Sequence, residues 1–243
     1  MPTRLVEILL TEKGHAQWRL RSVTNEPDIG GKYLTVSHRW GTSQHLQLTK
    51  ATFSALEEGK ALCELPPKYR DAFTVARHLS VKLVWIDSLC IIQDLKEDWL
   101  HEASQMRDVY ANAMCNIAIA LDYHEDSEYF STRLATALKP IFIHPQWIPN
   151  LVQEYILYEL DLWNTEVHSS KLNYRGWLLQ ERFLAPCLLY LTKQQLFWES
   201  GEVAACEMYP NGKPCGLTKS SGHKCLNQLL AQGSEDDSAV LNA

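Results

Sequence analysis

An apolar run that ends abruptly in polar side chains is the feature that most constrains the fold of this chain. Residues 83–94 read LVWIDSLCIIQD, so the apolar stretch LVWI is followed at once by Asp87 and Ser88. A parallel strand buried on both faces is a continuous apolar run, and its carboxyl end delivers polar side chains to a ligand crevice. The pattern therefore predicts an α/β protein with a polar site at its strand ends.

Two other segments share this pattern. Residues 33–37 (YLTVS) lead into His38, Arg39, Trp40 and Gly41, and residues 114–121 (MCNIAIAL) lead into Asp122. The carboxyl ends of parallel strands meet at one edge of a sheet. We therefore expect these polar residues to form one site.

Helical periodicity separates the three predicted strands. Pro66 and Pro67 open a predicted helix whose apolar residues recur at helical spacing up to Leu79. Asp94 and Glu97 resemble a capping box for a second helix. Its predicted apolar stripe consists of Trp99, Ala103, Met106, Tyr110 and Ala113. The alternation of strand and helix predicts right-handed crossovers and a parallel sheet covered on both faces.

The remaining segments complete the predicted domain. Residues 4–23 alternate as a β-hairpin, which we expect to pack over one edge of the domain. A short helix at residues 176–184 precedes apolar strands at 186–191 and 195–199, while residues 122–173 are an elaboration beside the sheet. We expect one α/β domain over residues 1–219 and a polar, flexible tail over residues 220–243.

The composition excludes several classes of protein. With 23 basic and 29 acidic residues the chain has a net charge of −6, so it lacks the broad positive surface that binds nucleic acid or anionic lipid. No apolar run reaches the roughly 20 residues of a membrane helix, and the first residues do not form a signal peptide. We expect a cytoplasmic protein with no membrane partner, and the charge balance disfavours a nucleic-acid partner without excluding one.

Cysteine spacing favours reduced thiols and no metal site. The chain has 7 scattered cysteines, of which several lie in apolar runs as small apolar side chains. Three cysteines and one histidine gather between Cys206 and Cys225, but they do not form paired CxxC knuckles. A serine nucleophile is disfavoured as well, because no GxSxG motif occurs and the neighbours Ser37 and His38 point to opposite faces of a strand.

Three long blocks resemble the fungal heterokaryon incompatibility (HET) domain. They are YLTVSHRWG at residues 33–41, LVWIDSLCIIQD at 83–94 continued by DWLHEASQMRDVYANAMCNIAIA at 98–120, and RGWLLQERFLAP at 175–186. The blocks occur in order, and the resemblance covers most of the chain from about Arg4 to Glu207. It implies a fungal protein that takes part in programmed cell death on non-self recognition.

The HET domain is in turn similar to the TIR fold, which implies a flavodoxin-like parallel sheet here. Many TIR domains hydrolyse NAD with one glutamate that lies four residues after a tryptophan in a helix. Trp177 and Glu181 have this spacing. The resemblance thus implies that Glu181 is catalytic, that NAD or a related nucleotide is the substrate with no further cofactor, and that the chain forms a homo-oligomer on activation.

The other expected substrate contacts follow the first two strands or precede Glu181. They are Ser37, His38, Arg39, Trp40, Gly41, Asp87, Ser88 and Trp177. We expect Arg39 to hold pyrophosphate, Trp40 to stack on a ring, and Asp87 with Ser88 to bind ribose hydroxyls.

Each assignment has a structural alternative. Glu181 would then be a surface residue paired with Arg175 or Arg182, and Asp87 would cap a helix or loop. Glu102 is the second choice for the catalytic carboxylate, although its side of the helix, with Asp98 and His101, is expected to be solvated.

Two other functions stay open. One is a non-catalytic, self-associating signalling or adaptor domain in heterokaryon incompatibility. The other is a nuclease or nucleotide-processing enzyme that uses Asp87, Glu102 and Asp122 with a divalent ion.

Overall fold

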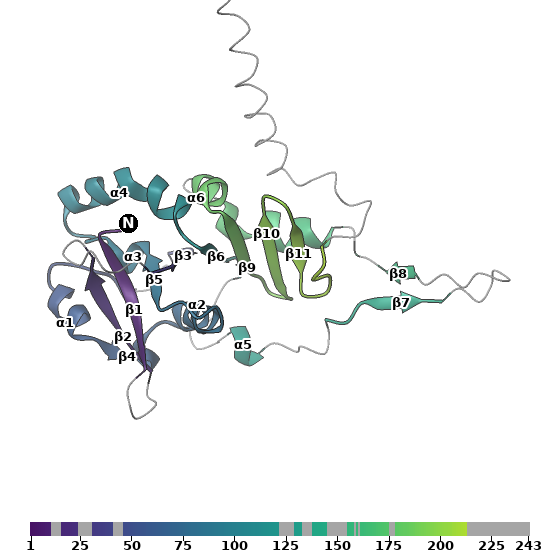
Figure 1. Cartoon of the computed structure of the whole chain (residues 1–243), viewed down its shortest axis with the longest axis horizontal. Helices are drawn as coiled ribbons and strands as arrows, with labels where there is room; N and C mark the ends of the chain where they lie inside the picture. Colours follow the sequence, from purple (N-terminus) through teal and green to yellow (C-terminus); the bar gives the residue numbers. More distant parts are fainter. Residues whose placement is uncertain are drawn as a thin grey trace, which may run out of the picture.

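The computed structural model consists of a large mixed sheet, helices on both of its faces and a separate two-stranded ribbon (Figure 1). It describes residues 1–10, 16–23, 31–40, 46–121, 129–132, 138–144, 155–157, 159, 161–174 and 178–212. The strands are β1 (Arg4–Leu10), β2 (Ala16–Ser22), β3 (Tyr33–Ser37), β4 (Lys60–Ala61), β5 (Leu83–Ile86), β6 (Cys115–Ile119), β7 (Ile141–Ile143), β8 (Tyr155–Leu157), β9 (Cys187–Leu191), β10 (Leu196–Ser200) and β11 (Ala204–Cys206). The α-helices are α1 (Phe53–Glu58), α2 (Pro67–His78), α3 (Asp87–Cys90), α4 (Lys96–Ala111), α5 (Tyr129–Thr132) and α6 (Leu178–Leu184).

Four parallel strands form the centre of the large sheet, in the order β5-β3-β6-β9. Every residue of β3, β5 and β6 is buried. Strands covered on both faces read as unbroken apolar runs, which is why these three segments stood out in the sequence. The predicted α/β class and the three central strands are confirmed.

Antiparallel strands extend the sheet at both sides, so the predicted parallel sheet forms the centre of a larger mixed sheet. On one side β10 and β11 follow β9, and on the other side β1 pairs with β5 and continues to β2 and β4. The predicted N-terminal hairpin is confirmed, but it joins the sheet edge through hydrogen bonds instead of packing over it. The full sheet has the order β11-β10-β9-β6-β3-β5-β1-β2-β4 in the part of the chain described.

Helices α4 and α6 lie on one face of the sheet and α2 lies on the other (Figure 1). Tyr33 of β3 donates a hydrogen bond of 2.6 Å to the carbonyl of Val109, which fixes α4 over the central strand. Burial, aided by the charge of Asp108, raises the pKa of Tyr33 to about 12. Trp85 of β5 meets Tyr110 of α4 edge to face with ring centroids 5.6 Å apart.

The start of α2 agrees with the sequence prediction, whereas the start of α4 differs from it. Pro67 occupies the first turn of α2, as predicted. Helix α4 begins at Lys96 after Leu95, without a side-chain cap, so the predicted Asp94–Glu97 capping box is wrong. The Asp94 carboxylate instead accepts the backbone N–H of Lys50 at 2.9 Å and ties the preceding loop to it.

The elaboration predicted over residues 122–173 contains β7 and β8, which pair with each other beyond the β11 side of the sheet (Figure 1). The Tyr209 hydroxyl donates to the Leu157 carbonyl at 3.0 Å and connects this ribbon to the main body. The predicted tail over residues 220–243 lies outside the described residues. Among the helices that the structure describes, none has both the length and the apolar character needed to span a membrane.

Candidate functional site

The carboxyl ends of β3 and β5 place their polar residues side by side. Val36 pairs with Ile86 in the parallel register, so the next residues, Ser37 and Asp87, are level on neighbouring strands. Neighbouring strands lie about 4.8 Å apart. These two strand ends therefore lie side by side, but their polar residues divide between the two faces of the sheet, and Asp122, predicted to follow the third strand, lies outside the described residues.

A buried chain of hydrogen bonds runs across the end of β3 toward α6. The Thr35 hydroxyl donates to Asn116 Oδ1 at 3.0 Å, and Asn116 Nδ2 donates to Ser37 Oγ at 2.9 Å. The Ser37 hydroxyl donates a hydrogen bond to Glu181 Oε2. Glu181 is only 1 % exposed, so Ser37 places a hydrogen-bond donor against a carboxyl group inside the protein. We call these four residues the buried relay.

Helix α6 is held in place by the residue that follows Glu181. The Arg182 guanidinium binds both carboxylate oxygens of Glu199 on β10, at 2.9 and 3.1 Å, and the Tyr190 hydroxyl donates to the same carboxylate at 2.9 Å. Burial, followed by the charge of Glu199, raises the pKa of Tyr190 well above its ordinary value. A bidentate pair of this kind fixes orientation as well as distance. Arg182 thus holds α6 against β10 while Glu181 reaches β3.

The other face of the sheet holds a second buried network. His38 Nε2 lies 2.9 Å from the Tyr69 hydroxyl, which is 2.8 Å from Ser88 Oγ. His38 Nδ1 lies 3.7 Å from Asp87 Oδ1, so the histidine connects α2 with the end of β5. Ser37 and His38 point to opposite faces of the sheet, as predicted. Ser88 is fully buried beside Tyr69.

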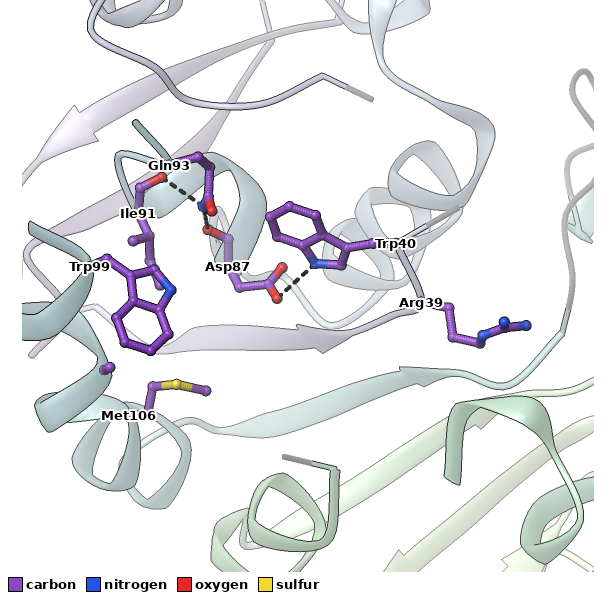
Figure 2. A pocket seen from close by; sticks show the side chains of 8 residues that line it. Arg39, Trp40, Asp87, Ile91, Gln93, Trp99 and Met106 are labelled. Carbon is purple, nitrogen blue, oxygen red and sulfur yellow. Dashed lines mark hydrogen bonds between the residues drawn. The ribbon is translucent and has the colours of Figure 1, made fainter. Parts of the chain in front are cut away.

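A pocket of about 350 Å³ opens beside Asp87, on the face of the sheet that α4 covers. It is lined by Arg39, Trp40, Asp87, Ile91, Gln93, Trp99, Ala103 and Met106. The Trp40 indole donates a hydrogen bond of 3.1 Å to Asp87 Oδ2, and the Ser88 backbone N–H donates to Asp87 Oδ1 at 2.7 Å. Figure 2 shows the Asp87 side chain between the Trp40 and Trp99 indoles, with Arg39 directed away from both.

Comparison with known families gives a match over the central part of the chain. The family model described as heterokaryon incompatibility protein (HET) matches residues 33–181, more than half of the sequence. The chain belongs to the HET family. The match begins at the first residue of β3 and ends at Glu181, so it spans both the pocket and the buried relay. No curated protein and no solved structure matches the chain.

The structure settles where most of the predicted site residues of this HET domain lie. Arg39, Trp40 and Asp87 line the pocket, while Glu181 and Ser37 form the neighbouring relay. His38 and Ser88 belong to the network on the α2 face and are not among the pocket residues. Gly41 and Trp177 lie outside the described residues.

The surface alternative for Glu181 is wrong. The side chain is buried against Ser37, and the neighbouring Arg182 is bound to Glu199. Spacing along a helix does not show which side chain turns inward, because that depends on the strand beneath the helix.

Sequence reasoning missed one wall of the pocket. Trp99 was expected in the apolar stripe of its helix, but it is 42 % exposed and lines the pocket with Ala103 and Met106. These three residues do share a face of α4, as the helical spacing indicated. Trp99, nearest the amino end of α4 among them, is partly exposed to solvent in the pocket.

The acidic flank of α4 also differs from expectation. Glu102 is buried, and Arg4 lies 3.4 Å from it and 2.6 Å from Asp98, so the predicted solvated flank is wrong for Glu102. Burial raises the pKa of Glu102, while Arg4 opposes the change. Arg4 also donates to the Cys90 carbonyl at 2.7 Å and ties β1 to α3 and α4.

The residues expected for the metal-dependent alternative are not shown to gather. Glu102 is engaged by Arg4 and Asp87 by Trp40, and Asp122 lies outside the described residues. Within the described part of the chain no three histidine, cysteine or acidic residues form a candidate metal site.

Proposed function

We propose that this HET domain is a cell-death effector in heterokaryon incompatibility that hydrolyses NAD to nicotinamide and an ADP-ribose product. Glu181 is the catalytic residue, and NAD is the substrate with no further cofactor. The observation that carries the proposal is a helix carboxylate buried against the end of the central parallel strand, one strand away from an aromatic pocket.

The chemistry requires little more than a well-placed anion. Nicotinamide leaves as a neutral molecule from a cationic glycoside, so no general acid is needed to break the bond. Positive charge then develops on the ribose, and a nearby carboxylate stabilises it as in glycosidases. Water adds to the ribosyl cation and releases a proton. Glu181 is surrounded by protein, where such an electrostatic contribution is larger than in water.

The strand order supports a ligand site at this position. In chain order the parallel strands β5-β3-β6-β9 follow the 2-1-3-4 order of flavodoxin-like sheets, to which TIR domains belong. Ligands of such sheets bind where the order reverses, between the first and third strands. These strands are β3 and β6, which carry Ser37 and Asn116, the residues that connect to Glu181.

The substrate must reach Glu181 before the reaction can occur. The carboxylate is sealed by its contact with Ser37 and is not among the pocket residues. Substrate must therefore replace this contact, or α6 must shift so that Glu181 faces the pocket. We place this change in self-association into a homo-oligomer, the activation mode that the TIR resemblance implies.

Nicotinamide release from NAD tests the proposal. We expect turnover by the concentrated protein, and a loss of about 100-fold or more in Glu181→Gln, which keeps the shape of the side chain. The matched control is Glu202→Gln, because Glu202 is exposed in the loop between β10 and β11 and its loss should leave turnover unchanged. Turnover that persists in Glu181→Gln would reject the assignment of the catalytic residue.

One observation favours a second function. The complete burial of Glu181 in a hydrogen bond is also what a purely structural residue would show, which fits a non-catalytic adaptor domain. In that case neither the monomer nor assembled protein would release nicotinamide, and Glu181→Gln would retain cell-death signalling. The two functions therefore differ in both assays.

A further inference from the structure

Two tryptophans are exposed at the same pocket. Trp40 is 39 % exposed and Trp99 is 42 % exposed, although tryptophan is on average a largely buried residue. They come from the loop after β3 and from α4, which are far apart in the sequence. Two large aromatic side chains left in water around one cavity mark a site that gains energy when a ligand covers them.

The wall between the indoles is negative. The Asp87 carboxylate lies there, and Met106 adds a polarisable thioether (Figure 2). Asp87 accepts hydrogen bonds from Trp40 and the Ser88 backbone and lies 3.7 Å from His38 Nδ1, and these contacts fix its carboxylate in the wall of the pocket. Aromatic faces with a carboxylate attract a flat cation more strongly than a neutral ring of the same size.

The size and the rim restrict the ligand further. A cavity of about 350 Å³ is near the lower end of small-molecule sites, so it accommodates a mononucleotide better than a whole dinucleotide. Arg39 lies at the rim and is directed outward (Figure 2), where a guanidinium binds phosphate bidentately. The pocket thus offers a cation site inside and an anion site at its mouth.

We propose that this pocket binds the nicotinamide mononucleotide half of the substrate, with the cationic pyridinium ring between Trp40 and Trp99 against Asp87 and the phosphate at Arg39. The assignment rests on the proposed function for the identity of the substrate. It places the ribose toward β3, because Asp87 is level with Ser37, the partner of Glu181. The neutral adenine ring would gain stacking but no attraction from the carboxylate.

Binding can be measured without turnover. The probe is the carbocyclic analogue of nicotinamide mononucleotide, in which a CH₂ group replaces the ribose oxygen and the glycosidic bond resists hydrolysis. Isothermal titration calorimetry on the full chain should detect this ligand. The reduced, neutral form of nicotinamide mononucleotide and AMP should each bind at least five-fold more weakly.

Two variants assign the interaction to the pocket. Trp99→Ala and Asp87→Asn should each weaken the cationic ligand about five- to thirty-fold, and Asp87→Asn should also abolish the preference over the reduced form. The matched controls on α4 are Leu100→Ala and Glu97→Gln, both exposed and outside the pocket, which should not change the affinity. Equal affinity for the reduced form, tighter binding of AMP, or no binding at all would overturn the proposal.

The same measurements separate this proposal from the proposed function. If the cationic ligand binds in a Trp99-dependent manner but the protein never releases nicotinamide, the pocket assignment stands and the NAD hydrolase fails. If nicotinamide is released and Glu181→Gln abolishes it, while Trp99→Ala and Asp87→Asn leave ligand affinity unchanged, the hydrolase stands and the pocket assignment fails.

Discussion

Replacing Ser37 by alanine removes one hydroxyl from the centre of the buried relay. That hydroxyl donates to the Glu181 carboxylate and accepts a hydrogen bond of 2.9 Å from Asn116 Nδ2. All three side chains are buried, so water does not reach the groups that lose their partner. The substitution therefore affects the stability of the fold as well as the position of the candidate catalytic residue.

The size of the loss follows from the two hydrogen bonds. A hydrogen bond to a charged group contributes about 1.5–3 kcal/mol, and a buried donor left without its acceptor costs about 1–3 kcal/mol. Because the two contributions share one hydroxyl and the site relaxes partly, we expect Ser37→Ala to lower the free energy of unfolding by about 3 kcal/mol. For a chain of this size the melting temperature should fall by about 6–12 °C.

Urea denaturation followed by circular dichroism measures this free energy, and two variants calibrate it. Thr35→Val removes only the neutral hydrogen bond to Asn116 and should cost about 1 kcal/mol. Ser54→Ala, on the exposed side of α1, should cost nothing. If Ser37→Ala costs less than about 1 kcal/mol, or no more than Thr35→Val, then Ser37 does not hold a charged Glu181 and the reasoning is wrong.

Three further predictions concern groups outside the relay. Arg4→Met should lower the free energy of unfolding by about 3–5 kcal/mol in urea denaturation, because it leaves Glu102 buried without its ion pair. Burial raises the pKa of Glu102, so the unfolded state ionises first as the pH rises above about 4.5. Glu102→Gln should therefore gain stability relative to the wild type as the pH rises from about 4.5, and a difference that does not change with pH would contradict this. A hydrogen bond from Cys115 lowers the pKa of Cys187, which favours the reactive thiolate. Cys115→Ala should therefore slow the alkylation of Cys187 by iodoacetamide near neutral pH, as followed by mass spectrometry. An unchanged rate would show that the two thiols do not interact.

The central strands were predictable because burial on both faces leaves a direct trace in the sequence. Residues of β3, β5 and β6 are all buried and mostly apolar, and each strand is followed by polar side chains. The antiparallel flank also had a signal that the prediction did not use. Only residues 192–195 separate β9 from β10, and a parallel crossover needs a dozen residues or more. The short connection requires an antiparallel pair.

The pocket and the relay were less accessible to sequence reasoning because their residues meet only in three dimensions. Glu181 and Ser37 are 144 residues apart, and periodicity along α6 does not show which strand lies beneath it. Trp99 matched the apolar stripe of α4, but only the packed structure shows that its side chain is exposed and lines the pocket. The strand ends in the sequence therefore indicate where a site lies, but the side chains that the covering helices contribute to it are seen only in the structure.

The double variant Glu181→Met/Ser37→Ala tests whether the relay is present for stability or for chemistry. Burying a carboxylate costs several kcal/mol of desolvation, and well-packed apolar side chains in place of buried charged groups are often neutral or stabilising. A methionine would hold α6 against β3 with no charge to satisfy. We therefore expect the double variant to recover most of the stability that Ser37→Ala loses, and to release no nicotinamide from NAD. Full stability without turnover would mean that the Glu181 carboxylate serves the reaction. A double variant as unstable as Ser37→Ala would mean that the relay holds the fold together. In that case the catalytic assignment of Glu181 would lose its physical basis.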